Sequence, residues 1–237
     1  MKIQKIRFIE PGNLPYRKSI KNLYTYDKYM RTPSVGLLTL STIVKQQIDN
    51  TLMYSESISR IEWQDVLDAD IIFIGIFTFN ANRGYELAEY IRKNSQAVVV
   101  LGGLHASLNY SEACQHCDYV LLGEADESIL ELIDAIEKGR PVDFPGVAYE
   151  TDRNIYNTGN QSPPQNIDVI PNRDLLFRYQ QMAGHNVIWP QVHASRGCPH
   201  NCDYCALIRH FGRNMRTRTP ENVVEDIRRT IAFHDNK

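Results

Sequence analysis

The sequence has no long apolar run and no strong charge of either sign. None of its 237 residues falls in a run of about 18 apolar side chains, so no segment is typical of a membrane-spanning helix. Residues 1–6 alternate polar and apolar side chains and lack the features of a secretion signal. Lysine and arginine number 26 against 28 acidic residues, which gives no long-range attraction to nucleic acid or anionic lipid. We therefore expect a cytoplasmic protein without a nucleic-acid or membrane partner.

Cysteine is scarce, and its distribution is uneven. There are five cysteines, an odd number, which without an export signal favours metal ligation over disulfides. The segment Cys114 to Cys117 is a CxxC pair with a histidine inside, and we interpret it as ordinary core because nothing nearby supplies further ligands. The other three, Cys198, Cys202 and Cys205, stand together as CxxxCxxC and are the candidates for chemistry. Internal repeats and low-complexity tracts are both lacking.

Apolar runs alternate with helical periodicity over the first 140 residues. We predict strands at residues 3–9, 52–55, 71–77, 98–101 and 119–122. Helices are predicted at residues 34–47, 82–93, from about 111, and 128–137. The run at 71–77 is continuously apolar, as a parallel strand covered on both faces requires. This pattern predicts an α/β fold with a flavodoxin-like, doubly wound parallel sheet, which binds ligands beyond the carboxyl ends of its strands.

The composition predicts three parts along the chain. Residues 1–140 form the sheet domain, and residues 141–186, rich in proline, asparagine and aspartate, form a linker with a short strand candidate at 147–150. Residues 187–237 form a second unit, in which a strand at 187–194 leads into the cysteine loop. Pro220 then opens a helix, with Thr219 as its expected cap.

The three clustered cysteines narrow the choice of metal. Soft thiolates select iron–sulfur clusters, zinc or copper over hard cations. A structural zinc site needs a fourth ligand, for which His193 and His200 are possible donors. His200, however, lies between two of the cysteines, where reaching the same ion would strain the loop, and no second CxxC follows. Three thiolates can also hold three corners of a cubane cluster and leave its fourth iron open.

The cysteine loop resembles that of the radical S-adenosylmethionine enzymes. The resemblance rests on the three spaced cysteines, on Tyr204 just before the last of them, and on the lead-in at residues 195–197. It implies that Cys198, Cys202 and Cys205 bind a 4Fe–4S cluster and that S-adenosylmethionine chelates its fourth iron. Cleavage of the sulfonium would then give a 5'-deoxyadenosyl radical. The backbone of Tyr204 would lie near the adenine.

The front domain resembles the cobalamin-binding domain that precedes many radical enzymes of this class. The similar segments are residues 33–38, 99–107 and 117–127. The resemblance implies a rim of loop residues facing the corrin or its tail, made by Thr78, Gly102, Gly103, His105, Gly123 and Glu124. The DxHxxG motif that supplies a cobalt ligand in many cobalamin proteins is absent, so no cobalt ligand is predicted. The alternative is a flavodoxin-like domain without a cofactor.

Together the two resemblances predict the N-terminal portion of a cobalamin-dependent radical enzyme, a methyltransferase or a catalyst of related radical carbon chemistry. The alternative is a non-catalytic module that binds cobalamin or a structural zinc. Residues 187–237 could supply only the start of a partial TIM-like barrel, since a full barrel takes about 200 residues. We therefore expect a truncated enzyme whose small-molecule substrate the sequence does not identify. An exposed sheet edge would favour a homo-oligomer.

Four arginines follow the cysteine loop, and two interpretations of them stay open. They could bind a carboxylate or phosphate of a substrate or cofactor, or they could be solvated surface. These residues are Arg209, Arg213, Arg216 and Arg218.

Overall fold

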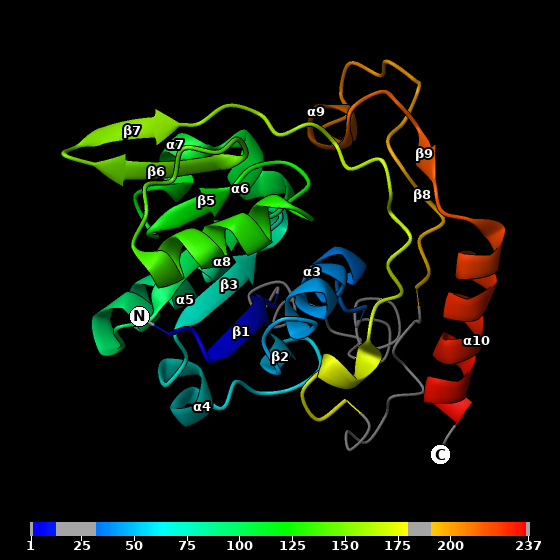
Figure 1. The fold of residues 1–237 in the computed structure, drawn as a ribbon, viewed down its shortest axis with the longest axis horizontal. Coiled ribbons are helices and arrows are strands. Elements are labelled where there is room, and N and C mark those ends of the chain that lie inside the picture. Colours follow the sequence, from blue (N-terminus) through cyan, green and yellow to red (C-terminus); the bar gives the residue numbers. More distant parts are fainter. Residues whose placement is uncertain (1, 13–31, 180–190, 236–237) are drawn as a thin grey trace, which may run out of the picture.

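The computed structural model describes residues 2–12, 32–179 and 191–235. Its main feature is a seven-stranded sheet with the order β2-β1-β3-β4-β5-β6-β7 (Figure 1). The strands are β1 (Lys5–Glu10), β2 (Asn50–Ser55), β3 (Ile71–Gly75), β4 (Val98–Gly102), β5 (Tyr119–Leu121), β6 (Val147–Thr151) and β7 (Asn154–Asn157). The first five are parallel, in the flavodoxin-like order 2-1-3-4-5, so the predicted fold class is confirmed.

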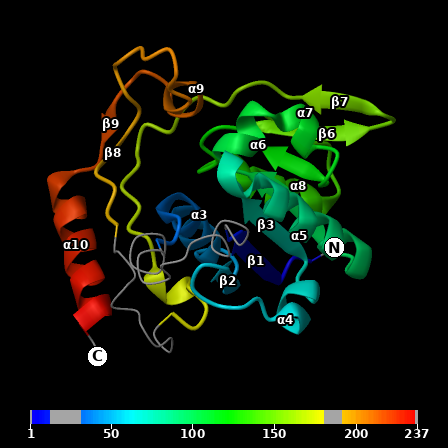
Figure 2. The same cartoon turned by 180° about the vertical axis from the view of Figure 1, so that it is seen from behind.

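Helices cover both faces of the sheet. One face packs against α3 (Val35–Lys45) and α8 (Ser128–Lys138), and the other against α4 (Trp63–Leu67), α5 (Ala81–Asn94), α6 (Leu104–Leu108) and α7 (Tyr110–Ala113) (Figures 1 and 2). The Ser34 side chain accepts a hydrogen bond from the Leu37 backbone N–H and so caps α3. Among the described residues, no helix is long and apolar enough to cross a membrane.

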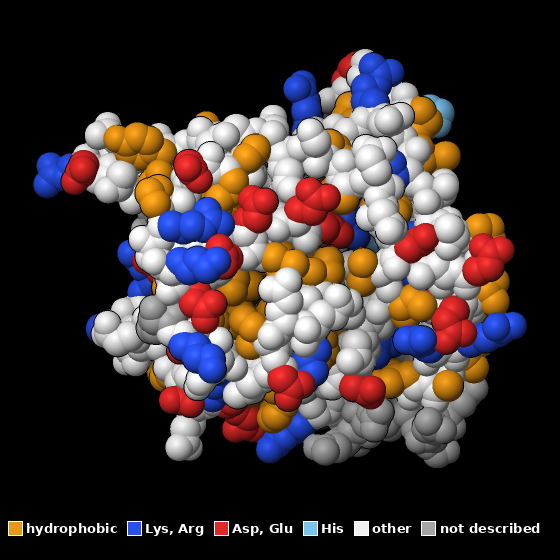
Figure 3. Space-filling model, viewed as in Figure 1, with side chains coloured by type: hydrophobic (Ala, Val, Ile, Leu, Met, Phe, Trp, Pro, Cys, Tyr) orange, Lys and Arg blue, Asp and Glu red, His pale blue; other side chains and the backbone are white. Residues whose placement is uncertain are grey.

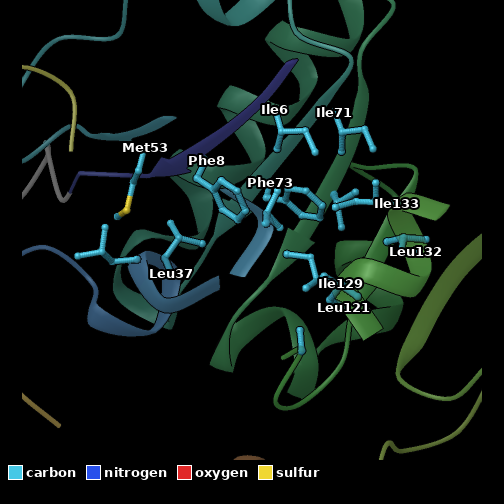
Figure 4. Close-up of a cluster of buried hydrophobic side chains, with 14 of the residues drawn as sticks. Ile6, Phe8, Leu37, Met53, Ile71, Phe73, Leu121, Ile129, Leu132 and Ile133 are labelled. Atoms are coloured by element: carbon cyan, nitrogen blue, oxygen red, sulfur yellow. The ribbon is translucent and has the colours of Figure 1, made fainter. Parts of the chain in front are cut away.

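The core on the α3 and α8 face is centred on two stacked rings. Phe8 and Phe73 are paired neighbours on β1 and β3, and their ring centroids lie 4.9 Å apart. Figure 4 shows Leu37 from α3 and Ile129 from α8 approaching these rings. The side chains of β3 are apolar on both faces, so alternate residues enter a core on each face. In β1, Ile6 and Phe8 enter this core, whereas Ile9 enters the core on the opposite face.

A hairpin extends the sheet into the segment whose composition predicts a linker. β6 covers the predicted strand at 147–150, pairs antiparallel with β5, and turns into β7. Asp152 and Arg153 at the turn have φ of 50° and 60°, the conformation of a tight two-residue hairpin. All four residues of β7 are exposed. The short helix predicted from about residue 111 is confirmed as α7, and a further short helix, α6, precedes it.

The C-terminal segment differs from the prediction at its first strand. The elements are η2 (Arg173–Leu175), β8 (Ser195–Arg196), α9 (Leu207–Phe211), β9 (Arg216–Thr217) and α10 (Pro220–Asp235). Of the strand predicted at 187–194, residues 187–190 lie outside the described residues, and for residues 191–194 the prediction is wrong. The carbonyls of Gln191 and His193 accept hydrogen bonds from the side chains of Arg173 and Arg218 instead of from a neighbouring strand. The helix predicted at Pro220 is confirmed.

Candidate functional site

A cavity of about 550 Å³ lies at the carboxyl ends of the parallel strands. Its walls come from the ends of β3, β4 and β5, from the start of α3 and from the cysteine segment, including Cys198. Figure 3 shows apolar side chains gathered in the middle of the molecular face, with acidic and basic groups interspersed around them. Doubly wound sheets bind ligands at this end of their strands. The cavity is therefore the candidate functional site.

The predicted glycine rim divides into two kinds of position. Gly102 and Gly123 line the cavity, and a Cβ at either would meet no heavy atom closer than 3.8 Å. Gly103 also lines it, and both Gly103 and Gly123 have positive φ, of 92° and 65°, but only at Gly103 would a Cβ collide, 2.7 Å from the Ile76 carbonyl oxygen. The chain's own backbone thus requires glycine at 103. The Ser107 hydroxyl, which sequence reasoning did not assign, donates to the Gly103 carbonyl and accepts from the Gly123 N–H, at 2.9 Å each.

Thr78 and His105 lie together, as adjacent rim loops predict, but neither is among the described residues that line the cavity. Thr78 begins η1 (Thr78–Asn80), and its hydroxyl is 3.1 Å from Nδ1 of His105 in α6. Phe77, one residue before Thr78, lines the cavity and stacks on Phe79 with a centroid distance of 5.6 Å. At this rim, Phe77 and not the polar pair contacts the cavity.

Glu124 lines the cavity, but arginines engage its carboxylate. One oxygen accepts hydrogen bonds from Arg196 at 2.9 Å and from Arg216 at 3.1 Å, and Arg216 also binds the other oxygen. Burial by itself would lower the pKa of Arg196, and hydrogen bonds to Asp126 and Glu124 raise it overall. Arg216 is therefore neither solvated surface nor free to bind the anion of a substrate or cofactor, the two roles expected for arginines after the cysteine loop. It is buried and paired with Glu124.

A second buried ion-pair cluster holds another of these arginines. Asp226 of α10 accepts hydrogen bonds from Arg173 at 2.8 Å and from Arg218 at 2.7 Å, and its side chain is fully buried. Arg209 and Arg213 are exposed, as a solvated surface predicts.

The three cysteines lie on one loop between β8 and α9 and are free and half-buried. The backbone N–H of Cys198 donates to the Gly212 carbonyl at 3.2 Å, and that of Cys205 donates to Cys202 at 3.1 Å. Across residues 2–12, 32–179 and 191–235, no three cysteine, histidine or acidic side chains converge to hold a metal ion. Three free soft donors within one short loop fit an iron–sulfur cluster or zinc chemically, although their thiols do not meet at one point.

The exposure of Tyr204 differs from that of the Cys114 and Cys117 pair, and the expected position of the Tyr204 backbone near an adenine stays a prediction. The Tyr204 side chain is 92% exposed. Cys114 and Cys117 are buried in the core on the α5 face, which confirms their interpretation as core residues. Burial raises the pKa of the Cys114 thiol to about 11 and raises that of Cys117 further. Thiols in such surroundings are mostly protonated and poor metal ligands.

Two histidines of the C-terminal segment line the cavity. Burial lowers the pKa of His210, and partial desolvation together with the charges of Arg196 and Arg218 lowers that of His193, although His193 is exposed. Both imidazoles are therefore neutral near pH 7. Nδ1 of His210 is buried and has no hydrogen-bond partner among the described residues. A single histidine in α9 has no spacing signal, which is why sequence reasoning did not select His210.

The chain is similar in sequence to several methyltransferases, although no protein-family model matches it. It is 28% identical over 239 residues to an uncharacterized methyltransferase of Pyrococcus horikoshii, covering 96% of this chain and 50% of that protein. It is 31% identical over 163 residues to the bacteriochlorophyllide d C-8(2)-methyltransferase of Chlorobaculum tepidum, covering 65% and 32%. The chain thus spans half or less of the length of these two relatives.

Two solved structures share the fold. The radical S-adenosylmethionine methyltransferase TsrM from Kitasatospora setae, solved with cobalamin and a 4Fe–4S cluster, superposes with a TM-score of 0.71 at 15% identity, over 98% of this chain and 46% of TsrM. The cobalamin-dependent S-adenosylmethionine radical enzyme OxsB gives 0.74 at 14% identity, over 100% and 33%. Fold and cavity thus define a doubly wound α/β protein in which the cysteine segment lines a cavity at the carboxyl edge of the sheet. The resemblance found in the sequence is confirmed to this extent: the chain is similar in sequence to these methyltransferases, and it shares its fold with two cobalamin-dependent radical S-adenosylmethionine enzymes.

Proposed function

We propose that this chain is part of a cobalamin-dependent radical S-adenosylmethionine methyltransferase, or of an enzyme of related radical carbon chemistry. Cobalamin would occupy the cavity, and Cys198, Cys202 and Cys205 would hold a 4Fe–4S cluster that binds S-adenosylmethionine. When bound, these groups would supply methyl transfer and radical generation. The observation that carries the proposal is that one cavity is lined both by the carboxyl edge of the sheet and by the first cysteine of the loop.

The chain's own residues would bind and enclose the ligands. Gly102 and Gly123 leave the strand ends without side chains, so a flat macrocycle could approach the backbone closely. Leu37 and Phe77 contribute apolar wall, which would exclude water from a bound ligand. His193 and His210 would present neutral imidazoles rather than positive charges.

Anaerobic reconstitution tests the cluster. The chain should take up about four iron and four sulfide per molecule and develop broad charge-transfer absorption in the visible range. The triple variant Cys198→Ala, Cys202→Ala, Cys205→Ala should lose this uptake. Cys114→Ala is the matched control, because it removes a buried thiol outside the loop and should leave uptake intact. Stoichiometric zinc without iron uptake would favour the structural-metal module instead.

Cobalamin retention tests the cavity separately. After incubation with hydroxocobalamin and desalting, the chain should keep a corrin spectrum, and the triple cysteine variant should keep it too. Retention in both proteins would support a cobalamin site built by the sheet edge. A chain that takes up iron and sulfide but keeps no corrin would remove cobalamin from the proposal.

A further inference from the structure

Glu124 is the centre of a buried ion-pair network that joins the sheet to the cysteine segment. It lies in the loop between β5 and α8 and binds Arg196 and Arg216, with which it shares three hydrogen bonds. Asp126, two residues on, also accepts from Arg196, at 2.8 Å. The side chains of Glu124 and Arg216 are 3% and 6% exposed. Two carboxylates and two guanidinium groups thus neutralise each other away from water.

The two arginines stand at the base of the cysteine loop. Arg196 in β8 and Arg216 in β9 are paired residues of the antiparallel ladder that closes this loop. Only Gly197 separates Arg196 from Cys198, and a Cβ on Gly197 would lie 2.2 Å from the Asn214 carbonyl oxygen. Because the backbone packs this closely, the first cysteine has little freedom to move relative to the arginine pair.

The other end of the network is fixed to the sheet. The backbone of Gly123 bonds to the Ser107 hydroxyl, and the N–H of Leu122 donates to the Gly146 carbonyl at 2.8 Å. A guanidinium fork that binds both oxygens of a carboxylate fixes direction as well as distance. Glu124 and Cys198 both line the cavity, so the network sets where the loop stands relative to it.

We propose that Glu124 is a positioning residue, which holds the cysteine loop at the cavity through Arg196 and Arg216. This proposal rests on the proposed function in one respect, namely that the loop binds an iron–sulfur cluster. It differs from the contact to corrin that the sequence resemblance implies for Glu124, because both carboxylate oxygens are bound by arginine. The ion pairs would fix the distance between a cluster on the loop and a ligand in the cavity.

Thiol reactivity tests the proposal on the full metal-free chain. Each protein is treated briefly with iodoacetamide, and alkylation of each cysteine is followed by peptide mass spectrometry. Glu124→Gln keeps the side-chain shape and removes the charge, so Cys198 should be alkylated several-fold faster. Arg216→Lys keeps the charge and removes the fork, and it should have the same effect. The buried Cys114 should stay slow in both, which shows that the fold is intact.

Asp65→Asn is the matched control for loss of a structural ion pair. Asp65 binds Arg7 through two hydrogen bonds, and Arg7 is 5% exposed, but neither is among the described residues lining the cavity. This variant should leave Cys198 reactivity unchanged. Equal Cys198 rates in Glu124→Gln and Asp65→Asn would overturn the proposal. If Glu124→Gln does not fold, Glu124→Asp together with Arg216→Lys serves the same comparison.

A second readout uses the reconstituted chain. Glu124→Gln should still take up iron, but the electron paramagnetic resonance spectrum and midpoint potential of its reduced cluster should shift from the wild type. A merely stabilising role would leave both unchanged in the folded fraction. If the wild type binds no iron, the proposed function fails, and the alkylation result still decides whether Glu124 positions the loop.

Discussion

The backbone of Gly103 lies directly against that of Ile76, with no space between them for a side chain. The Ile76 N–H donates to the Gly102 carbonyl at 2.9 Å, and the His105 N–H donates to the Ile76 carbonyl at 3.2 Å. A Cβ on Gly103 would lie 2.7 Å from the Ile76 oxygen and 3.1 Å from its nitrogen. The ends of β3 and β4 are thereby joined at the edge of the cavity.

Replacing Gly103 by alanine should lower the free energy of unfolding by more than the strain of its backbone conformation alone. Gly103 has φ 92° and ψ −179°, and Gly212 has φ 73° and ψ 177°, but nothing lies within 4 Å of a Cβ on Gly212. Gly212→Ala should cost about 1 to 3 kcal/mol from conformational strain. Gly103→Ala should cost about 1 to 3 kcal/mol more from the clash. Urea unfolding measures both, and equal losses would contradict the close approach to Ile76.

Glu10 should make the stability of the protein depend on pH. Burial raises the pKa of this carboxyl to about 7, against the hydrogen bonds from Ser55 and from the Ser34 backbone, which lower it. The folded state therefore holds the proton more tightly than the unfolded chain does. Stability from this group is present below about pH 4.5 and is lost as the pH rises through 7. Glu10→Gln should be more stable than the wild type at pH 8, by up to about 3 kcal/mol, and equal to it at low pH.

Asp65 supplies a control of opposite sign. Hydrogen bonds from Arg7 hold the pKa of its carboxyl well below the usual range, so the ionised form stabilises the fold. Asp65→Asn should therefore lower the free energy of unfolding at pH 7, and the difference should shrink as the pH falls. Denaturant titrations at several pH values measure both variants. Parallel pH profiles for the two would contradict the assignment of Glu10.

Gly197 should be needed for iron uptake but not for corrin retention. Its φ is 88°, and a side chain would run into the Asn214 backbone beneath the cysteine loop. Gly197→Ala should displace the loop and lower iron and sulfide uptake several-fold, measured after anaerobic reconstitution. Gly159→Ala is the control, because its φ is 93° but nothing lies within 4 Å of its Cβ position. Full uptake by Gly197→Ala would show that the loop tolerates this displacement.

Gly36 allows the cavity to be filled from a helix. It lies in α3 and lines the cavity, and the nearest atom to a Cβ there is Oγ of Ser34 at 3.9 Å. Gly36→Phe should abolish corrin retention after desalting while leaving iron uptake intact. Gly36→Ala is the control at the same position and should retain corrin while stabilising the helix by up to about 1 kcal/mol. Retention by the phenylalanine variant would place cobalamin elsewhere.

The parallel sheet was predictable because its strands are buried on both faces. Continuous apolar runs such as β3 have few other environments in a water-soluble fold. The hairpin's second strand, β7, was not predictable, because its residues are exposed and its sequence, Asn154–Asn157, carries two asparagines. Over residues 191–194 the predicted strand does not form, because side chains of Arg173 and Arg218, distant in sequence, bind the carbonyls of Gln191 and His193 that a sheet partner would use.

The cysteines of the candidate site were predictable because their spacing is local. The use of Glu124 was not, because its partner Arg216 lies 92 residues away in the sequence. No periodicity or motif reports a pairing at that separation, and only the fold brings the two together. The sequence likewise does not distinguish Gly102 from Gly103. A Cβ at Gly102 would have space, whereas a Cβ at Gly103 would collide with the Ile76 backbone.

The ion pairs also bear on how separable the two parts of the chain are. Glu124 and Asp126 lie in the loop between β5 and α8, and the arginines that neutralise them belong to the cysteine segment. A sheet domain produced alone would carry two unbalanced negative charges at the rim of its ligand cavity. It would repel anions there, and its mouth would hydrate and loosen. The contact between the two parts is therefore held by ion pairs. A fusion of the sheet domain to a different C-terminal segment would need two new cationic side chains in place of Arg196 and Arg216.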